Sequence, residues 1–340
     1  MVAPPPTRQP LLSVDDLVVS FDGPLGTHPV LNGVSFHVDA GETLAILGES
    51  GSGKSVTVRA VMALLPRHSA TIARGTIRYD GEELTALPVR RTRQLCSTEF
   101  AMVFQDSLSA LNPVVRVGDQ IAELYRVRRG VSRREAWARA VAGLEQVGIP
   151  HAAQRARDYP HQFSGGMRQR VVIAMALALG PRLLIADEPT TALDVTVQAQ
   201  IMDLLRDLRR ANGMAMILIT HDLGVVADVA DRVAVMYAGS VVETGPLRTV
   251  YDTPAHPYTR GLMNSIPTPE HAGARLTPIE GMPPAPHRMP AGCAFHPRCP
   301  LARPRCRTDR PALREITPGQ LSACHYAEEV VTGVHTRDAA

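Results

Sequence analysis

The sequence has 340 residues, of which 45% are hydrophobic and 20% are charged, and its formal net charge is +3. These values are typical of a globular protein with a sizeable core, arranged as two domains or as one large domain with an appendage. The small net charge gives no argument for a nucleic-acid partner, and no stretch approaches the roughly 20 apolar residues of a membrane helix. The proline-rich residues 1–10 lack the apolar core of a signal peptide and are expected to form a disordered arm.

Two strands are predicted near the start of the chain, over Leu11–Phe21 and Val30–Val38. The aromatic ring of Phe21 is able to stack on an adenine base. A buried strand residue is an equally good interpretation of the same phenylalanine. We therefore predict Phe21 as a nucleotide contact and keep the structural alternative open.

The most informative stretch is Gly48–Ser55, which lies between an apolar strand over Glu42–Leu47 and a helix over Val56–Leu65. It fits G-x-x-x-x-G-K-S, the phosphate-binding loop of nucleotide hydrolases, in the strand–loop–helix setting that this motif needs. Its glycines let the backbone close around an anion, and its N–H groups and the helix start favour negative charge there. The predicted nucleotide contacts are Gly48, Glu49, Ser50, Gly51, Ser52, Gly53, Lys54 and Ser55.

Two side chains of this loop and one beyond it are assigned to the phosphates and to Mg²⁺. Lys54 is expected to reach the β- and γ-phosphates, and the Ser55 hydroxyl is expected to ligate Mg²⁺. Further along, an apolar strand over Phe100–Phe104 ends at Gln105, and an irregular segment that suits a hinge follows it. The side-chain oxygen of Gln105 is therefore predicted to reach Mg²⁺ or the attacking water.

Two helices are predicted after this segment, over Val117–Arg129 and Ser132–Val147. Ser132 followed by Glu135 fits a capping box at the start of the second helix, and Gly148 fits a stop just beyond its end. Together these helices form a helical insert between Gln105 and the next motif.

That motif is the run Ser164, Gly165 and Gly166, which opens a long amphipathic helix to about Leu179. A serine hydroxyl and two glycines at a helix start form a second anion-binding surface, which need not face the chain's own nucleotide. A purely structural N-cap explains the three residues equally well when they are taken by themselves.

A second set of carboxylates follows, at the end of the apolar strand Arg182–Pro189. Asp187 is expected to hold Mg²⁺ through its water shell, and Glu188 to accept a proton from the attacking water. Buried carboxylates at a strand end are costly without a cation, which argues against a structural role. The loop after them ends at Asp194, which is predicted to make a contact across an interface.

The last motif of this part is His221, at the end of the buried strand Met214–Thr220. A lone histidine is more often structural than catalytic. In a parallel sheet this one ends a strand beside the phosphate loop, so we predict that it hydrogen-bonds the γ-phosphate. A hairpin over Val233–Met236 and Ser240–Glu243 is expected to close the domain.

The order of these motifs resembles the nucleotide-binding subunit of ABC transporters over about residues 10–260. The resemblance implies an α/β fold: a P-loop NTPase core of ABC type, with a mixed β-sheet and RecA-like core, an antiparallel β subdomain and a helical subdomain at about 106–165. In that family two nucleotide domains meet head to tail. Ser164, Gly165, Gly166 and Asp194 would then act on the partner's ATP, with Mg²⁺ at each site. Residues 11–260 would form this domain.

The sequence departs from the usual signature at Phe163, which replaces leucine, and at Met167, which replaces glutamine. The methionine resembles the D-type ATPase of oligopeptide and dipeptide importers. Segments Tyr251–Thr259, Gly281–Pro284 and Gly292–Pro300 also resemble the tail of that subfamily, and residues 261–340 would form this extension. The resemblance implies a heterodimer with a second ATPase, two membrane permeases, an extracytoplasmic solute-binding protein, and a place on the cytoplasmic face of the membrane. Peptides are the expected solutes, with nickel as the alternative.

The extension carries four of the five cysteines, spaced C-x₅-C-x₆-C-x₁₇-C. Four thiolates suit a 4Fe–4S cluster or a tetrahedral zinc ion. The absence of a close C-x₂₋₄-C pair and the proline after Cys299 favour the cluster, and the resemblance implies it too. Zinc and free thiols stay open as alternatives. Because the segment is proline-rich and poor in apolar residues, a metal centre is expected to supply its folding energy. The predicted ligands are Cys293, Cys299, Cys306 and Cys324.

A different class of function is a soluble ABC-type ATPase that acts on ribosomes or nucleic acid. Such proteins usually fuse two ATPase cores or carry a long insertion in the core. The present sequence has one core and an ordinary helical insert, so the importer subunit is the preferred interpretation.

Overall fold

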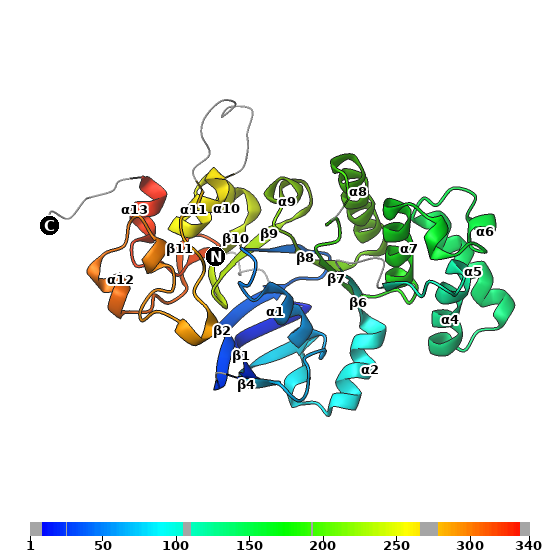
Figure 1. Ribbon diagram of the computed structural model, residues 1–340, viewed down its shortest axis with the longest axis horizontal. Coiled ribbons are helices and arrows are strands. Elements are labelled where there is room, and N and C mark those ends of the chain that lie inside the picture. Colours follow the sequence, from blue (N-terminus) through cyan, green and yellow to red (C-terminus); the bar gives the residue numbers. More distant parts are fainter. Residues whose placement is uncertain (1–8, 25, 105–109, 192, 266–277, 334–340) are drawn as a thin grey trace, which may run out of the picture. The chain divides into compact units, whose positions relative to one another are not determined.

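The computed structural model describes residues 9–24, 26–104, 110–191, 193–265 and 278–333. Figure 1 labels the helices and strands. The chain divides into two compact units: unit 1 comprises Met1–Leu87 and Thr220–Ala340, and unit 2 comprises Pro88–Ile219. The arm predicted over residues 1–10 lies outside the described residues, except for Gln9 and Pro10.

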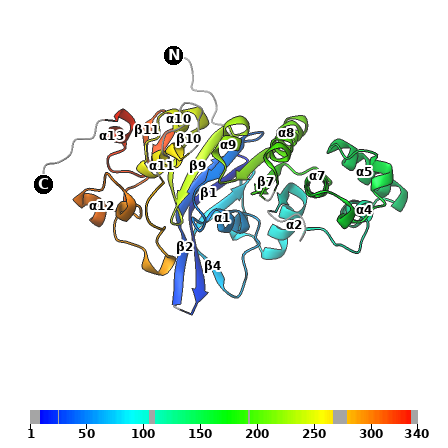
Figure 2. The same ribbon diagram turned by 45° about the horizontal axis from the view of Figure 1, so that its top comes forward.

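An antiparallel sheet in unit 1 has the strand order β2-β1-β4-β5, and Figure 2 shows its three long strands side by side. The two strands predicted near the start of the chain are confirmed. The second begins earlier than predicted because its pairing with the first continues to the turn, where Gly23 pairs with Gly26. The strands are β1 (Leu12–Gly23), β2 (Gly26–Val38), β4 (Ala70–Tyr79) and β5 (Glu82–Glu83).

A second sheet in unit 1 carries the phosphate loop, and its strand order is β11-β12-β10-β9-β3. Strand β3 (Thr43–Leu47) is buried along its whole length and runs parallel to β9 (Arg232–Tyr237), as expected for an apolar strand covered on both faces. Strand β10 (Ser240–Pro246) completes the predicted hairpin with β9. The helices of this part are α1 (Lys54–Val61), α9 (Leu223–Val229), α10 (Leu247–Asp252) and α11 (Pro257–Asn264).

The C-terminal extension is part of unit 1 and continues its sheet. Strand β12 (Gln320–Ser322) pairs with β10, and β11 (Arg314–Thr317) pairs with β12. The side chains of Phe295, Ala327 and Val330 are at most 2% exposed. The extension therefore shares a core with the ATPase sheet, and the expectation that a metal centre supplies its folding energy stays a prediction. Its helices are α12 (Pro304–Thr308) and α13 (Ala327–Thr332).

Unit 2 is built around three parallel strands in the order β8-β7-β6. The outer two are β6 (Phe100–Val103) and β8 (Ala215–Ile219), and every residue of β7 (Leu183–Asp187) and β8 is buried. Helix α8 (Val195–Asn212) follows β7. Helix α2 (Val89–Glu99) was not predicted, because its residues are mostly polar and only Thr92 and Cys96 face the interior.

The helical insert of unit 2 matches its prediction closely. Helix α4 spans Val117–Arg129, and α5 (Arg133–Gln146) is capped by Ser132, whose hydroxyl accepts from the Glu135 N–H at 3.2 Å. The Glu135 carboxylate accepts from Arg139 at 2.7 Å, so the structure shows the serine half of the predicted capping box. Helix α6 (Ala152–Arg155) completes the insert, and α7 (Gly165–Leu177) begins at the Ser164–Gly166 motif that follows it.

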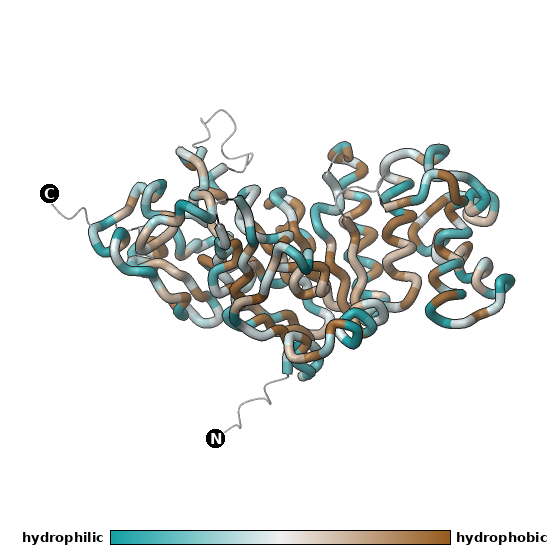
Figure 3. The backbone as a smooth tube through the Cα atoms, turned by 60° about the horizontal axis from the view of Figure 1, so that its bottom comes forward, coloured by the Kyte–Doolittle hydropathy of each residue, from teal (hydrophilic) through white to brown (hydrophobic). Residues whose placement is uncertain are grey.

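Hydropathy along the chain follows this architecture. Figure 3 shows hydrophobic and hydrophilic stretches alternating along the backbone trace, and the apolar strands β3, β7 and β8 are buried along their whole length. Across the described part of the chain, none of the helices combines the length and the apolarity needed to cross a membrane.

Candidate functional site

The phosphate loop leaves the end of β3 in a conformation that only glycine adopts easily. Gly48, Gly51 and Gly53 have φ angles of 147°, 80° and 102°, a region that residues with a Cβ atom avoid. A Cβ atom on Gly48 would lie 2.2 Å from the carbonyl oxygen of Met236 and 2.8 Å from Oγ of Ser52. The loop therefore packs directly on the backbone of β9, and Gly48 is required by space as well as by φ.

The side chains of the loop are arranged for an anion. Lys54 is 7% exposed, and its ammonium group donates to the carbonyl oxygens of Gly48 at 2.7 Å and Glu49 at 3.0 Å, so it lies over the loop. Ser52 is 3% exposed, and its hydroxyl has no hydrogen-bond partner among the described residues. A buried hydroxyl of this kind is costly unless a ligand oxygen satisfies it. Ser55 is the second residue of α1 and is partly exposed.

Two contacts to Glu49 were missed by sequence reasoning. The hydroxyl of Tyr258 accepts from the Glu49 N–H at 2.8 Å. Arg298, in the C-terminal extension, forms an ion pair with the Glu49 carboxylate at 2.6 Å. Tyr258 and Arg298 are more than 200 residues from Glu49 in the chain, so no local pattern reports these contacts.

The two carboxylates of unit 2 lie at the end of β7, as predicted. Asp187 is buried at 8% exposure. Glu188 has a φ of 51°, a left-handed conformation that is rare for a glutamate. It is held there because its N–H donates to the Ile219 carbonyl at 2.9 Å and its Oε2 accepts from the Thr191 hydroxyl at 3.0 Å. Strained backbone of this kind often marks functional sites, and the sequence gives no sign of it.

The signature residues and Asp194 meet within unit 2. Ser164 caps α7, its hydroxyl accepting from the Met167 N–H at 3.3 Å, and Asp194 caps α8, accepting from the Val197 N–H at 3.0 Å. A Cβ atom on Gly166 would lie 2.6 Å from Cγ1 of Val197. The two helix starts are therefore neighbours, and Gly166 allows their close approach. The structural N-cap that was the alternative interpretation of Ser164 is present. The role of Ser164 at a partner's ATP stays a prediction.

Two further predicted contacts, Phe21 and His221, belong to unit 1. Phe21 lies in β1, opposite His28 of β2, and is partly exposed. His221 is exposed at the start of the turn before α9, where Asp222 caps the helix. Gln105 lies outside the described residues. Two of the predicted Mg²⁺ ligands belong to different units, Ser55 to unit 1 and Asp187 to unit 2. The Mg²⁺ site therefore stays a prediction.

The four cysteines of the extension line one small cavity of about 20 Å³ in unit 1. Burial raises the pKa of the Cys299 and Cys324 thiols to about 12 and also raises the pKa of Cys293, so these thiols favour their neutral form. Over the described residues, no group of three or more His, Cys, Asp or Glu side chains is arranged to hold a metal ion. The predicted 4Fe–4S cluster is therefore not supported by this arrangement, although its four ligands surround the same space.

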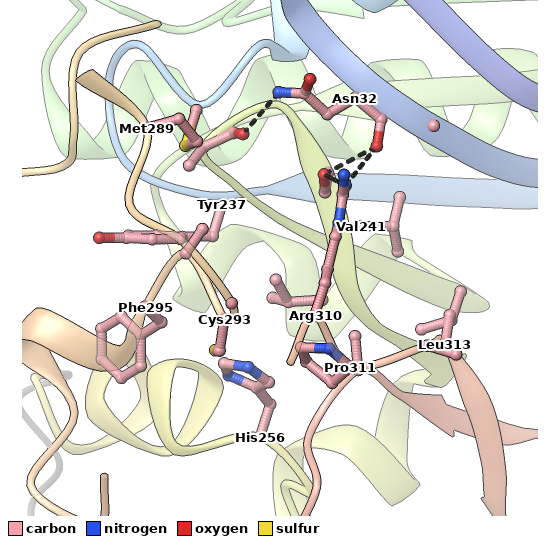
Figure 4. Close-up of a pocket in the computed structure, with 18 of the residues that line it drawn as sticks. Asn32, Tyr237, Val241, His256, Met289, Cys293, Phe295, Arg310, Pro311 and Leu313 are labelled. Carbon is pink, nitrogen blue, oxygen red and sulfur yellow. Dashed lines mark hydrogen bonds between the residues drawn. The ribbon is translucent and has the colours of Figure 1, made fainter. Parts of the chain in front are cut away.

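A larger cavity of about 480 Å³ is lined by residues of the extension and by residues of β1, β2 and the β9–β10 hairpin (Figure 4). Arg310 crosses it, and its guanidinium donates to the Asn32 carbonyl at 2.6 Å and the Ser240 hydroxyl at 2.8 Å. Figure 4 places Phe295, Cys293 and His256 at the opposite end. Burial lowers the pKa of His256 to about 3, so this histidine is neutral at physiological pH.

The loop geometry makes a specific prediction for Gly48→Ala. The new methyl group would meet the Met236 carbonyl, so the loop must shift away from β9, and we expect the Kd for ATP to rise at least tenfold in an equilibrium titration. Gly41→Ala is the matched control, because Gly41 also has a positive φ, of 77°, but no atom lies within 4 Å of the added Cβ. Equal ATP affinity in the two variants would contradict the proposed packing of the loop.

Comparison with known proteins agrees with this geometry. Residues 31–191 match the family described as "ABC transporter", and residues 242–306 match "Oligopeptide/dipeptide transporter, C-terminal region". The chain is 50% identical over 324 residues to the oligopeptide transport ATP-binding protein OppD of Salmonella typhimurium, covering 95% of each chain. It is 50% identical over 310 residues to the dipeptide transport ATP-binding protein DppD of Bacillus subtilis, covering 91% of this chain and 90% of that protein.

Solved structures give the same result for the fold. The dimeric ATP-binding cassette MJ0796 bound to ADP and Pi superposes with a TM-score of 0.62 at 27% identity, covering 70% of this chain and 99% of that one. CbiO1 from Clostridium perfringens, part of an ABC transporter complex, gives 0.62 at 28% identity, covering 72% and 92%. The predicted fold class is thus confirmed as an ABC-type P-loop fold. The chain belongs to the ABC transporter family of ATPases, within the group of oligopeptide and dipeptide transport ATP-binding proteins.

Proposed function

We propose that this ATPase powers the import of oligopeptides or dipeptides across a membrane. The observation that carries the proposal is the 50% identity to an oligopeptide transport ATP-binding protein over 95% of both chains. The match of residues 242–306 to the C-terminal region of oligopeptide and dipeptide transporters supports the same solute class. Nickel chelates and other small solutes are the alternative cargo, because a separate binding protein and the permeases select the solute.

In this proposal each predicted residue has one task at the nucleotide. The loop N–H groups and Lys54 bind the phosphates, and Lys54 exchanges its contacts with the Gly48 and Glu49 carbonyls for phosphate oxygens. Ser55, Asp187 and Gln105 hold Mg²⁺, which neutralises charge on the phosphates. Glu188 accepts the proton of the attacking water, His221 hydrogen-bonds the γ-phosphate, and Phe21 stacks on the adenine.

The ATP site is completed by a second ATPase chain. The exposed Ser164 offers its hydroxyl to the partner's ATP, and the helix start at Gly165 and Gly166 offers N–H groups. The exposed Asp194 contacts the partner chain. Met167 at the fifth signature position supports a heterodimer, in which the two sites are unlike. The dimer would sit on two permeases at the cytoplasmic face of the membrane and receive solute from an extracytoplasmic binding protein. Residues 11–260 would form the nucleotide domain and 261–340 the extension.

We further propose that Cys293, Cys299, Cys306 and Cys324 bind a 4Fe–4S cluster, with zinc as the alternative. The support is that all four thiols border one cavity and that cysteine is the usual donor to either centre. A cavity of about 20 Å³ holds little more than a water molecule. The thiols would therefore move outward to admit a cluster, and they would lose their protons, because metals bind the thiolate form.

Glu188→Gln tests the catalytic assignment. The amide keeps the size of the side chain but cannot accept the proton, so ATP hydrolysis should fall by about two to four orders of magnitude while ATP still binds and closes the dimer. Phosphate release and ATP binding are measured on the same sample, with the exposed Glu145→Gln of α5 as control. Wild-type turnover in the Glu188 variant would remove this residue from the mechanism.

Co-purification tests the importer proposal against the ribosomal alternative. The tagged chain, extracted from membranes in mild detergent, should bring down a second ATPase and two membrane proteins, identified by mass spectrometry. Recovery with ribosomal proteins, without any membrane subunit, would support the soluble ABC-type ATPase instead.

Metal analysis tests the cysteine proposal. The full chain, purified without oxygen, should contain iron and acid-labile sulfide and show visible absorbance, and Cys324→Ser should lose them. Cys96→Ser is the matched control, because Cys96 is buried in α2, in unit 2. A colourless, zinc-loaded protein would show that the cysteines bind zinc instead of the cluster. A metal-free protein would contradict both proposals.

A further inference from the structure

An arginine of the C-terminal extension holds the phosphate loop itself. Arg298 donates from Nη1 to Oε2 of Glu49 at 2.6 Å and from Nη2 to Oε1 at 2.9 Å. Its side chain is 5% exposed, and that of Glu49 is 27% exposed. Two parallel hydrogen bonds between guanidinium and carboxylate fix orientation as well as distance, and burial shields them from salt. The extension is thus joined to the second residue of the loop by a directional contact.

The guanidinium of Arg298 is itself held from the extension side. Its Nε donates to the carbonyl oxygen of Glu280 at 2.8 Å, and Nη2 donates to that of Ile279 at 3.3 Å. The hydrogen bonds with Glu49 raise the pKa of Arg298 above its usual range, so the guanidinium stays charged at physiological pH. Since its position is fixed independently of Glu49, Arg298 can position the loop rather than follow it.

Three aromatic side chains form a rigid support under this contact. Tyr237 of β9, Tyr258 of α11 and Phe295 of the extension are at most 2% exposed, and their ring centroids lie 4.7 to 5.4 Å apart. The Arg298 guanidinium lies 5.7 Å from the Tyr237 ring centroid, within cation–π distance. Figure 4 shows Tyr237 and Phe295 approaching one another from the β9 side and the extension side.

Glu49 is consequently held at three points. Its carboxylate accepts from Arg298, its N–H donates to the Tyr258 hydroxyl at 2.8 Å, and its carbonyl accepts from Lys54 at 3.0 Å. Lys54 is the residue assigned to the β- and γ-phosphates. A change at Arg298 therefore reaches the phosphate-binding ammonium through a single residue.

Arg298 also sits in the turn between two of the four cysteines. The His296 N–H donates to the Cys293 carbonyl at 3.0 Å, the Arg298 N–H to that of Phe295 at 3.0 Å, and the Cys299 N–H to that of His296 at 3.3 Å. These bonds make Cys293–Cys299 one compact turn. Whatever changes the conformation at Cys299 must also change the backbone of its neighbour Arg298.

We propose that Arg298 is a positioning residue for the phosphate loop, and that through it the conformation of the cysteine turn sets the affinity of this chain for ATP. The proposal rests on the proposed function in one respect, namely that ATP binds at Gly48–Ser55. It adds a route by which the C-terminal extension controls the nucleotide site.

The first test is an equilibrium titration of the full-length chain with a fluorescent ATP analogue and Mg²⁺. Arg298→Ala is expected to raise the Kd about tenfold, because coupling changes of this size follow from loss of one contact in a connected network. Arg298→Lys should recover part of the affinity, since lysine keeps the charge but cannot make both hydrogen bonds. Arg314→Ala is the matched control: Arg314 also pairs with a glutamate in the extension through two hydrogen bonds, but its partner is Glu328.

Folding is separated from positioning by a second variant. Glu49→Gln keeps the size of the side chain and removes the charge pair, so it should raise the Kd by a similar factor. The melting temperature of each variant shows whether it is folded. The double variant, with Arg298→Ala and Glu49→Gln, should bind ATP no more weakly than either single variant, since both changes remove the same contact.

The coupling to the cysteine turn is tested by Cys299→Ser. This change should weaken ATP binding when Arg298 is present and add little when Arg298 is already alanine. An additive loss would show that the cysteine acts by another route and would overturn the coupling. An unchanged Kd in folded Arg298→Ala, with normal binding by the wild type, would overturn the positioning role alone. A wild type that binds no ATP would overturn the proposed function together with this inference.

Discussion

The contact between Gly48 and β9 is the constraint on which the rest of unit 1 depends. Because the Gly48 backbone lies against the Met236 carbonyl, the loop is fixed relative to the sheet, and only glycine permits this approach. In addition, a backbone hydrogen bond from the Gly239 N–H to the Ser52 carbonyl at 3.0 Å joins the loop to the β9–β10 turn. The parallel register of β3 and β9, in which Leu47 pairs with Val235, delivers the loop to this place.

The extension builds on the same sheet through a buried carboxyl group. Glu243 of β10 is fully buried and accepts from the N–H groups of Ala255 and His256 at 2.7 and 2.9 Å and from Nε2 of Gln320 at 2.8 Å. Burial raises the pKa of Glu243 although these donors oppose the shift. One side chain thereby links β10, the segment before α11, and β12. The β9–β10 hairpin, which contacts the phosphate loop, is thus joined to β12 of the extension through Glu243.

Local patterns predicted the strands that carry the motifs and the helices α1, α4, α5 and α7, because each had its own signal. The phosphate loop, the capping serine of α5 and the apolar strands β3, β7 and β8 are of this kind. The predicted helix after the loop was too long: α1 ends at Val61, since Ala63 is left-handed with a φ of 53° and Pro66 follows. The left-handed Glu188 and the strands β11 and β12 carry no such signal. They depend on hydrogen bonds to residues distant in the chain, as does the Arg298–Glu49 pair, which joins positions 249 residues apart.

The way Glu49 is held has a consequence for nucleotide binding. The Lys54 ammonium contacts the Gly48 and Glu49 carbonyls, so a phosphate must compete with both hydrogen bonds. If Lys54 alone held Glu49, its departure would release the loop at the moment when the loop N–H groups must converge on the anion. Tyr258 and Arg298 hold Glu49 through its N–H and its carboxylate, independently of Lys54. In the proposed exchange of Lys54 from these carbonyls to phosphate oxygens, the loop would therefore keep its form, because its order comes from folding of the extension rather than from ATP binding.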